Sequence, residues 1–296
     1  MKNNEPEDLP NDRPATENKI SIKPCPICDS SSTTEIDSKL ILHECHTCSH
    51  IFTPLEKDQQ ESYDSEYFIE THKNWFENPN YELFEFLYDH IARSVRGEDL
   101  SLLDVGCGNG NFLKYVSKQN QKMQLVGLDL IDNNHPGITF IKGDLYEHDF
   151  NEKYDVVVSL AVVEHVDDPN LYIRKLSDAL KDDGLLYLMT INSNSLFYKI
   201  AALLKVLGFR AAYDRVYEHH HLQHYNNESL RKLLERNNYD ILLQKNTGYP
   251  LKCVDVPEGN FLIKAFYKLT VFVIFTLANP FHAGIMQSMA CRKRVK

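Results

Sequence analysis

Residues 101–118 combine a buried strand, a glycine turn and a helix, an arrangement that few folds accommodate. An apolar segment of strand length, 101–105, leads directly into Gly-Cys-Gly-Asn-Gly at 106–110 and then into a helical stretch. A glycine turn between a strand and a helix lets the backbone approach a ligand and points amide donors at it. The third glycine comes too early for the dinucleotide fingerprint, and the absence of Gly-Lys-Ser/Thr excludes a P-loop.

Further apolar segments follow at the spacing of alternating β and α units. The predicted strands occupy 125–129, 138–144, 154–160 and 184–190. Near-continuous apolar runs are typical of strands that helices cover on both faces. Asp104, Asp129 and Asp144 stand at strand ends, and open parallel sheets bind ligands at the carboxyl ends of their strands. We therefore predict an α/β, Rossmann-like, doubly wound sheet with a ligand at that edge.

These motifs together resemble the motif series of class I S-adenosylmethionine-dependent methyltransferases. The matching segments are Leu102-Leu103-Asp104-Val105-Gly106-Cys107-Gly108-Asn109-Gly110, Gly127-Leu128-Asp129, Gly143-Asp144 and Tyr154-Asp155-Val156-Val157-Val158. The resemblance implies a methyltransferase with seven strands, of which the sixth lies at 239–244 and the seventh, antiparallel, at 284–293. It also implies S-adenosylmethionine as cofactor, with the glycine turn at its methionine part, Asp129 at the ribose and Asp144 at the adenine. The expected cofactor-binding residues are Asp104, Gly106, Cys107, Gly108, Gly110, Asp129, Leu130, Asp144, Leu145, Leu160 and Glu164.

Four of the seven cysteines form two Cys-x-x-Cys pairs with sixteen residues between them. Thiolates at this spacing are typical ligands of tetrahedral structural zinc, and the intervening segment is predicted to form a β-hairpin. The expected zinc ligands are Cys25, Cys28, Cys45 and Cys48. Two unrelated reduced pairs are the alternative interpretation. The neighbouring histidines His43, His46 and His50 are expected at the surface.

The order of segments resembles zinc-ribbon methyltransferases of bacterial glycan and natural-product pathways. The resemblance rests on Ser49-His50-Ile51-Phe52-Thr53-Pro54, on Tyr67-Phe68, on an aromatic helix around 75–88 and on the segment 224–236. We expect a flexible tail at 1–20, the zinc ribbon at 21–58 and a helical linker or lid at 59–98. The methyltransferase domain would occupy 99–296, with an apolar helical insert at about 255–280.

Catalytic candidates follow the fourth predicted strand. The stretch Val163-Glu164-His165-Val166 is similar to one in ubiquinone-pathway O-methyltransferases, where the acid and the histidine are linked to the active site and a divalent ion. Because histidine titrates near neutral pH, His165 is a candidate base for a hydroxyl acceptor. Glu164 is a candidate for the cofactor site or for a divalent ion. The alternative is that both side chains only orient the loop.

A second group of candidates lies at 218–225, which reads Glu-His-His-His-Leu-Gln-His-Tyr. His221 and His224 would share one face if this stretch were helical, and either is a candidate base. Clustered histidines also suggest a transition-metal site. A solvated, irregular segment without chemistry is the alternative interpretation.

The apolar segment 260–278 is predicted to be a buried helix. It packs on the protein's own core, on a second copy of the chain, or on a membrane surface or lipid-linked acceptor, and the basic residues at 292–296 favour the last. Apolar runs are too short for a membrane span, and there is no signal-peptide core. We expect a cytoplasmic protein, with peripheral membrane contact left open.

Three functions compete at this stage. The first is methyl transfer to a hydroxyl, or to a carbon, of a small-molecule, glycan or lipid-linked acceptor. The second is RNA base methylation with the ribbon holding RNA, which a net charge of −10 and Ser159-Leu160-Ala161-Val162 in place of an Asn/Asp-Pro-Pro-Tyr/Phe motif disfavour. The third is a cofactor-binding module without catalysis.

Overall fold

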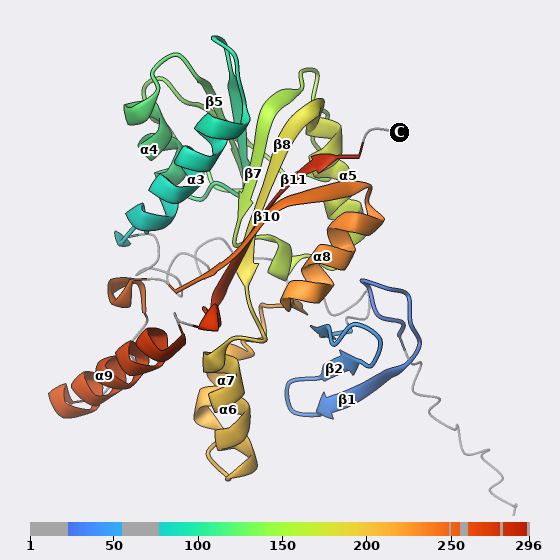
Figure 1. Ribbon diagram of the computed structural model, residues 1–296, viewed down its shortest axis with the longest axis vertical. Coiled ribbons are helices and arrows are strands. Elements are labelled where there is room, and N and C mark those ends of the chain that lie inside the picture. The colour runs from blue at the N-terminus through green and yellow to red at the C-terminus, as the bar shows by residue number, and fades with distance from the viewer. Residues whose placement is uncertain (1–22, 55–76, 249, 255–259, 279–280, 295–296) are drawn as a thin grey trace, which may run out of the picture.

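The computed structural model describes residues 23–54, 77–248, 250–254, 260–278 and 281–294, which form two sheets and their helices (Figure 1). The expected tail at 1–20, the Tyr67-Phe68 pair and Trp75 lie outside the described residues, as does much of the expected linker at 59–98. Within the described part, the aromatic helix begins later than predicted, as α3 (Tyr81–Ser94).

The larger sheet has seven strands in the order β10-β11-β8-β7-β4-β5-β6. Their bounds are β4 (Ser101–Val105), β5 (Gln124–Asp129), β6 (Thr139–Lys142), β7 (Tyr154–Leu160), β8 (Leu180–Ile191), β10 (Tyr239–Thr247) and β11 (Met286–Lys293). Neighbouring strands from β6 to β8 are parallel, and β11 pairs antiparallel with both β8 and β10. The prediction of a Rossmann-like, doubly wound sheet with an antiparallel last strand is therefore confirmed.

Helices cover both faces of this sheet (Figure 1). Helices α3 and α4 (Asn111–Gln119) lie on one face, and α5 (Pro169–Ala179) and α8 (Asn227–Arg236) lie on the other. Successive residues of a strand point to opposite faces, so Leu102 joins the α3–α4 core while Leu103 joins the α5–α8 core. This alternation inside a continuous apolar run explains why the strands read as wholly apolar.

The smaller sheet contains the N-terminal hairpin, in the order β1-β2-β3-β9. It comprises β1 (Thr33–Asp37), β2 (Leu42–Cys45), β3 (Ile51–Phe52) and β9 (Gln223–His224). The hairpin between the cysteine pairs is therefore present, with its turn at 38–41. Its sheet takes its fourth strand from the distant segment that follows β8, so the ribbon and the methyltransferase region share one sheet.

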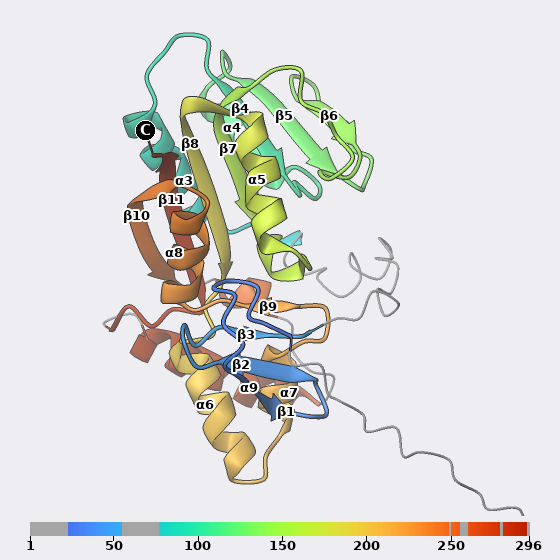
Figure 2. The same cartoon turned by 90° about the vertical axis from the view of Figure 1, so that its right-hand side faces the viewer.

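Three further helices gather at the carboxyl end of the parallel strands, beside the ribbon (Figure 2). They are α6 (Leu196–Val206), α7 (Ala211–Val216) and α9 (Phe261–Ala278). Helix α9 buries Val271, Ile274 and Ala278, while Phe272 and Leu277 remain more than half exposed. The expected buried helix thus packs on its own chain along one face only. Among the described residues, none of the helices has the length and hydrophobicity that a membrane crossing requires.

Candidate cofactor and acceptor site

A cavity of about 770 Å³ opens where the parallel strands end. On the sheet side it is lined by the turn after β4 and by the ends of β5 and β7, with the loop after β6. We call the opposite side of the cavity the acceptor half. Its lining residues are Leu40, Phe197, Tyr198, Asp214, Arg215, Val216, Tyr267, Val271 and Phe275. Ribbon, α6, α7 and α9 thus all contribute to this half.

The glycine turn fits closely between its neighbours. Gly106 has φ +71°, and a Cβ added to it would lie 2.3 Å from Cγ2 of Val162. Its amide donates to the carbonyl of Leu128 at 2.8 Å, which fixes the turn to β5. Gly110, also at positive φ, is the N-cap of α4 and does not line the cavity. Glycine at position 106 therefore allows the turn to pack directly against Val162 in a left-handed conformation that other residues rarely adopt.

Two carboxylates stand beside this turn. Asp129 ends β5, and its two carboxylate oxygens accept from the amides of Gly108 at 2.7 Å and Ile131 at 3.0 Å. Burial raises the pKa of Asp129. Asp104, at 2% exposure, has a side-chain oxygen, Oδ1, with no hydrogen-bond partner among the described residues. A buried polar atom without a partner is rare, and here it lies in a cavity wall where a ligand donor would satisfy it.

The pH dependence of stability should report the environment of Asp104. Burial, together with the nearby charge of Asp129, raises the pKa of Asp104 to about 8. The folded ligand-free protein therefore holds this proton more tightly than the unfolded chain does, and the fold loses stability as pH rises toward 8. Between pH 6 and pH 8.5 we expect wild type to lose about 2 to 3 kcal/mol more than Asp104→Asn in urea denaturation. Parallel stability curves for the two proteins would show that Asp104 is already ionised at pH 6.

The other predicted cofactor contacts border the same cavity. Leu145 is buried, and Leu130, Asp144 and Leu160 line the wall at its more open parts. Cys107 also lines it, with a thiol pKa that burial raises well above its ordinary value. The structure therefore brings every predicted cofactor residue except Gly110 to one cavity wall. These assignments remain predictions, because their contacts with a cofactor are untested.

Glu164, His165 and His221 form a cluster on the same cavity wall. Glu164 and His165 belong to a short 3-10 helix, Val163–His165, directly after β7. The Thr190 hydroxyl donates to Oε2 of Glu164 at 2.7 Å, and burial raises the pKa of Glu164 to about 7. His165 lies 4.8 Å from His221 between ring centroids. One ligand atom from each of the three side chains lies within 4.8 Å of the others, a donor set that suits a divalent ion.

A backbone contact determines the tautomer of His165. Nδ1 of His165 lies 3.0 Å from the carbonyl oxygen of His220, so Nδ1 donates and carries the hydrogen in the neutral ring. Nε2 is then the atom with the lone pair. A base or a metal ligand needs such an atom, so this tautomer suits both interpretations of the cluster.

His224 lies away from the cavity. It belongs to β9, is fully buried, and packs its ring 4.7 Å from that of Tyr217 between centroids. Burial lowers its pKa to about 3. The helical arrangement in which His221 and His224 would share a face is not formed, because 223–224 is a strand. His224 does not line the cavity, although its ring centroid lies 6.1 Å from that of His221, which does.

The four ribbon cysteines converge on one point. Sγ of Cys25 lies 3.7 Å from that of Cys48, and Sγ of Cys28 lies 3.5 Å from that of Cys45. Zinc bound at about 2.3 Å to four tetrahedral thiolates sets the sulfurs about 3.8 Å apart. These four residues therefore fit a zinc ion with no open position.

The expectation that His50 lies at the surface is wrong. His50 is fully buried and shares hydrogen bonds with Gln223 at 2.9 Å and Ser229 at 3.3 Å.

Sequence reasoning did not identify the residues that line the acceptor half, nor the Thr190–Glu164 contact. Leu40, Phe197 and Phe275 are apolar residues in helices or turns, and their periodicity shows burial without showing which cavity they face. Thr190 was visible only as the last residue of a predicted strand. Its position beside the candidate loop follows from the pairing of β7 with β8.

Comparisons with known proteins place this geometry among methyltransferases. A family model described as "Methyltransferase domain" matches residues 76–244. The chain is 30% identical over 179 residues to a mitochondrial ubiquinone biosynthesis O-methyltransferase of Dictyostelium discoideum, covering 53% of this chain and 55% of that protein. It is 33% identical over 140 residues to the ubiquinone biosynthesis O-methyltransferase of Ruegeria pomeroyi, covering 39% and 55%. The chain thus spans about half the length of these curated relatives.

A solved structure with a similar fold is the Burkholderia thailandensis 1,6-didemethyltoxoflavin-N1-methyltransferase, which contains its substrate and S-adenosylhomocysteine. The TM-score is 0.50 at 12% identity, over 89% of this chain and all of that one. The plantazolicin methyltransferase, solved with a substrate analogue and S-adenosylhomocysteine, has a TM-score of 0.50 at 17% identity, over 79% and 92%. At these identities the likeness shows a shared fold.

Proposed function

The chain belongs to the methyltransferase-domain family of enzymes, and on that premise we propose that it transfers a methyl group from S-adenosylmethionine to a hydroxyl group. The acceptor class is a small molecule, glycan or lipid-linked molecule. One observation carries the proposal: a glycine turn, two strand-end carboxylates and a histidine pair line the same cavity. The relatives named above are O-methyltransferases, which supports oxygen as the receiving atom.

The residues of the cavity fit S-adenosylmethionine. The glycine turn lines the cavity, and the side-chain oxygen of buried Asp104 that has no partner among the described residues can accept from an ammonium group. Asp129 would bind the ribose hydroxyls, and Asp144 with Leu145 would hold the adenine. The bound cofactor supplies an activated methyl group on a sulfonium. The protein supplies position, exclusion of water and a route for the acceptor proton.

His165 is the proposed base for that proton. Its Nε2 atom carries the lone pair, because the hydrogen of the neutral ring is held at Nδ1 by the carbonyl of His220. His221, whose ring is nearly perpendicular to that of His165 at 65°, orients it. The same histidines with Glu164 form a donor set for a divalent ion, which would instead bind the acceptor oxygen.

A His165→Ala variant should separate catalysis from cofactor binding. Loss of a general base lowers turnover by at least about 100-fold, while affinity for S-adenosylhomocysteine stays within about twofold. His148→Ala is the matched control, because His148 packs on Phe150 and does not line the cavity. Wild-type turnover in both His165→Ala and His221→Ala would show that neither histidine is needed to accept the proton. Loss of wild-type activity in EDTA, restored by a divalent ion, would favour the metal interpretation.

The function itself is tested by incubating the zinc-loaded protein with methyl-labelled S-adenosylmethionine and fractionated extracts of its source. We expect label in a low-molecular-weight or lipid fraction, and a mass increase of one methyl group on an oxygen. Label in RNA would instead support the base-methylation alternative. Cofactor binding without label in any fraction would support a non-catalytic module.

A further inference from the structure

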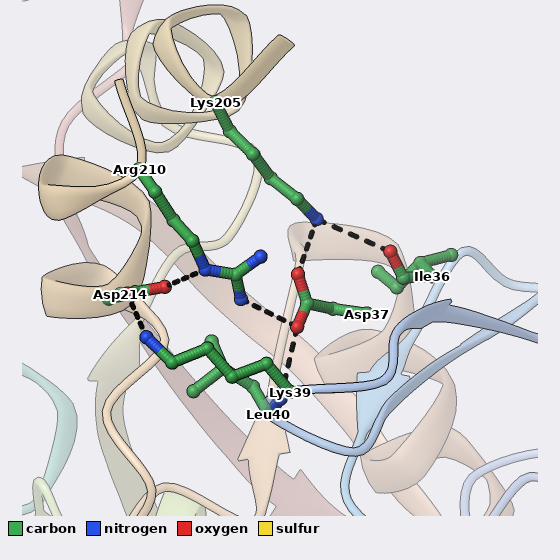
Figure 3. A network of polar contacts seen from close by, with 7 residues as sticks. All are labelled: Ile36, Asp37, Lys39, Leu40, Lys205, Arg210 and Asp214. Atoms are coloured by element: carbon green, nitrogen blue, oxygen red, sulfur yellow. Dashed lines mark hydrogen bonds and ion pairs between the residues drawn. The ribbon is translucent and has the colours of Figure 1, made fainter. Parts of the chain in front are cut away.

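A network of charges centred on one buried carboxylate joins the ribbon to helices α6 and α7 (Figure 3). At its centre the Asp37 carboxylate is 2% exposed, with Oδ2 at 2.6 Å from Nζ of Lys205 and Oδ1 at 2.7 Å from Nη2 of Arg210. Arg210 also pairs with Asp214 at 2.7 Å, and Asp214 pairs with Lys39 at 2.6 Å. Ribbon and helices therefore alternate in charge across their interface.

The local backbone shapes this centre. Asp37 ends β1, and its Oδ1 also accepts from the amide of Leu40, which closes the turn of the hairpin at 3.0 Å. Burial alone would raise the pKa of Asp37, but hydrogen bonds from Arg210 and Lys205 outweigh it and hold that pKa well below its usual range. Lys205 also stands 4.0 Å above the ring of Tyr213. One carboxylate thus fixes the hairpin turn and both helices together.

Both sides of this network reach the acceptor half of the cavity. On the ribbon side, Leu40 lines the cavity three residues after Asp37. On the helix side, Asp214 lines it, and the neighbouring carbonyl of Val216 accepts from the hydroxyl of Tyr198 on α6 at 2.7 Å. A shift of α6 and α7 would therefore move this wall, while the cofactor wall is built from β4, β5 and β7.

The ribbon has a second, separate attachment at its other end. Asn226 at the start of α8 donates to the carbonyls of Cys48 and Ser49, and Arg236 pairs with Asp29. The cysteine end is thus held on α8, and the hairpin turn is the part that meets α6 and α7. The hairpin turn thus extends from the part of the ribbon held on α8 to the side of the cavity formed by α6 and α7.

We propose that Asp37 is a positioning residue for the acceptor half of the cavity, holding α6 and α7 in place from the ribbon while touching neither substrate nor cofactor. The name acceptor half rests on the proposed function. The contact between the ribbon and the two helices is independent of that function. Removing one partner of a buried ion pair is strongly destabilising, because the remaining charge is left uncompensated. Surface ion pairs do not have this effect.

The experiment compares Asp37→Asn with Asp29→Asn in the zinc-loaded full chain. Asp29 is a ribbon aspartate of the same charge whose partner is on α8, and its side chain is 70% exposed. In Asp37→Asn we expect amide hydrogen exchange of residues 196–217 to be at least tenfold faster, with no change in Asp29→Asn. Calorimetric affinity for S-adenosylhomocysteine should stay within twofold in both variants.

Turnover and the KM for S-adenosylmethionine distinguish a positioning role from a general loss of stability, which would impair both. With the labelled acceptor fraction, Asp37→Asn should lower turnover at least tenfold at saturating S-adenosylmethionine and leave the KM for that cofactor unchanged. Arg210→Gln removes the partner from the helix side. The two effects should be less than additive in the double variant, because both single variants remove the Asp37–Arg210 contact.

Three outcomes would overturn the proposal. They are unchanged exchange in Asp37→Asn, an equal effect in Asp29→Asn, and a parallel loss of cofactor affinity. If Asp37→Asn does not fold, Lys205→Met tests the same contact from α6 and must give the same localised exchange. A wild-type protein that binds no S-adenosylhomocysteine would reject the proposed function, whereas the exchange result needs neither cofactor nor acceptor.

Discussion

A Cys45→Ser substitution is expected to release zinc from the N-terminal ribbon and to unfold residues 23–54. The four sulfurs lie at the separations that tetrahedral zinc requires, and the ribbon has only a few apolar residues of its own, such as Ile27 and Leu42. A structural zinc site contributes on the order of 10 kcal/mol to the folding of such a module. We expect zinc content to fall from one ion to less than about 0.2 per chain, with fast amide exchange throughout the ribbon.

The consequences should extend beyond the ribbon. Phe52 and the cysteines belong to the core that also holds Tyr225 and Leu230, and β3 pairs with β9. Loss of the ribbon should therefore lower the melting temperature of the whole chain. Cys291→Ala is the control, because Cys291 is buried on β11 and does not belong to the four-cysteine cluster, and this variant should keep its zinc. Wild-type zinc content in Cys45→Ser, or a folded ribbon purified without metal, would contradict the assignment.

An Asp129→Ala substitution is expected to weaken S-adenosylhomocysteine binding by about 100-fold, since each hydrogen bond to a charged group contributes about 1.5 to 3 kcal/mol. The carboxylate holds the amide of Gly108 and, in our proposal, the two ribose hydroxyls. Asp132→Ala removes the same charge three residues later, at an exposed position outside the cavity lining, and should bind normally. Calorimetry measures both variants.

Equal affinities in Asp129→Ala and Asp132→Ala would show that Asp129 does not contact the ligand. A circular dichroism spectrum that matches wild type is needed beside the titration, because Asp129 also fixes the glycine turn. Should the spectrum change, Asp129→Asn keeps the shape and one acceptor oxygen. It is then expected to lose affinity by about tenfold.

The sheet was predictable because each of its strands carries its own local signal. Ser101–Val105 and Tyr154–Leu160 have the predicted bounds, and the antiparallel last strand lies where the family resemblance placed it. Strand ends were harder to predict. β10 continues three residues beyond 244, because pairing with β11 extends it past the end of the apolar pattern.

The contacts between distant segments could not be read from the sequence. His50 is buried because Gln223 and Ser229, more than 170 residues later, supply its hydrogen bonds. His224 has the residue type of a base but lies in a strand that completes the ribbon sheet. The role of Asp37 likewise depends on Arg210, and no local periodicity marks that pair. Residue type, spacing and the family resemblance identified residues that line one side of the cavity, whereas the residues of the acceptor half come from segments whose mutual contacts the sequence does not show.

The central claim is that the glycine turn and the strand-end carboxylates bind S-adenosylmethionine. Calorimetric titration of the zinc-loaded wild-type protein with S-adenosylhomocysteine tests it most directly. We predict one site per chain with a Kd of about 10 μM or tighter, equivalent to about −7 kcal/mol or more. The absence of any binding heat at protein concentrations well above that value, at two temperatures, would contradict the account.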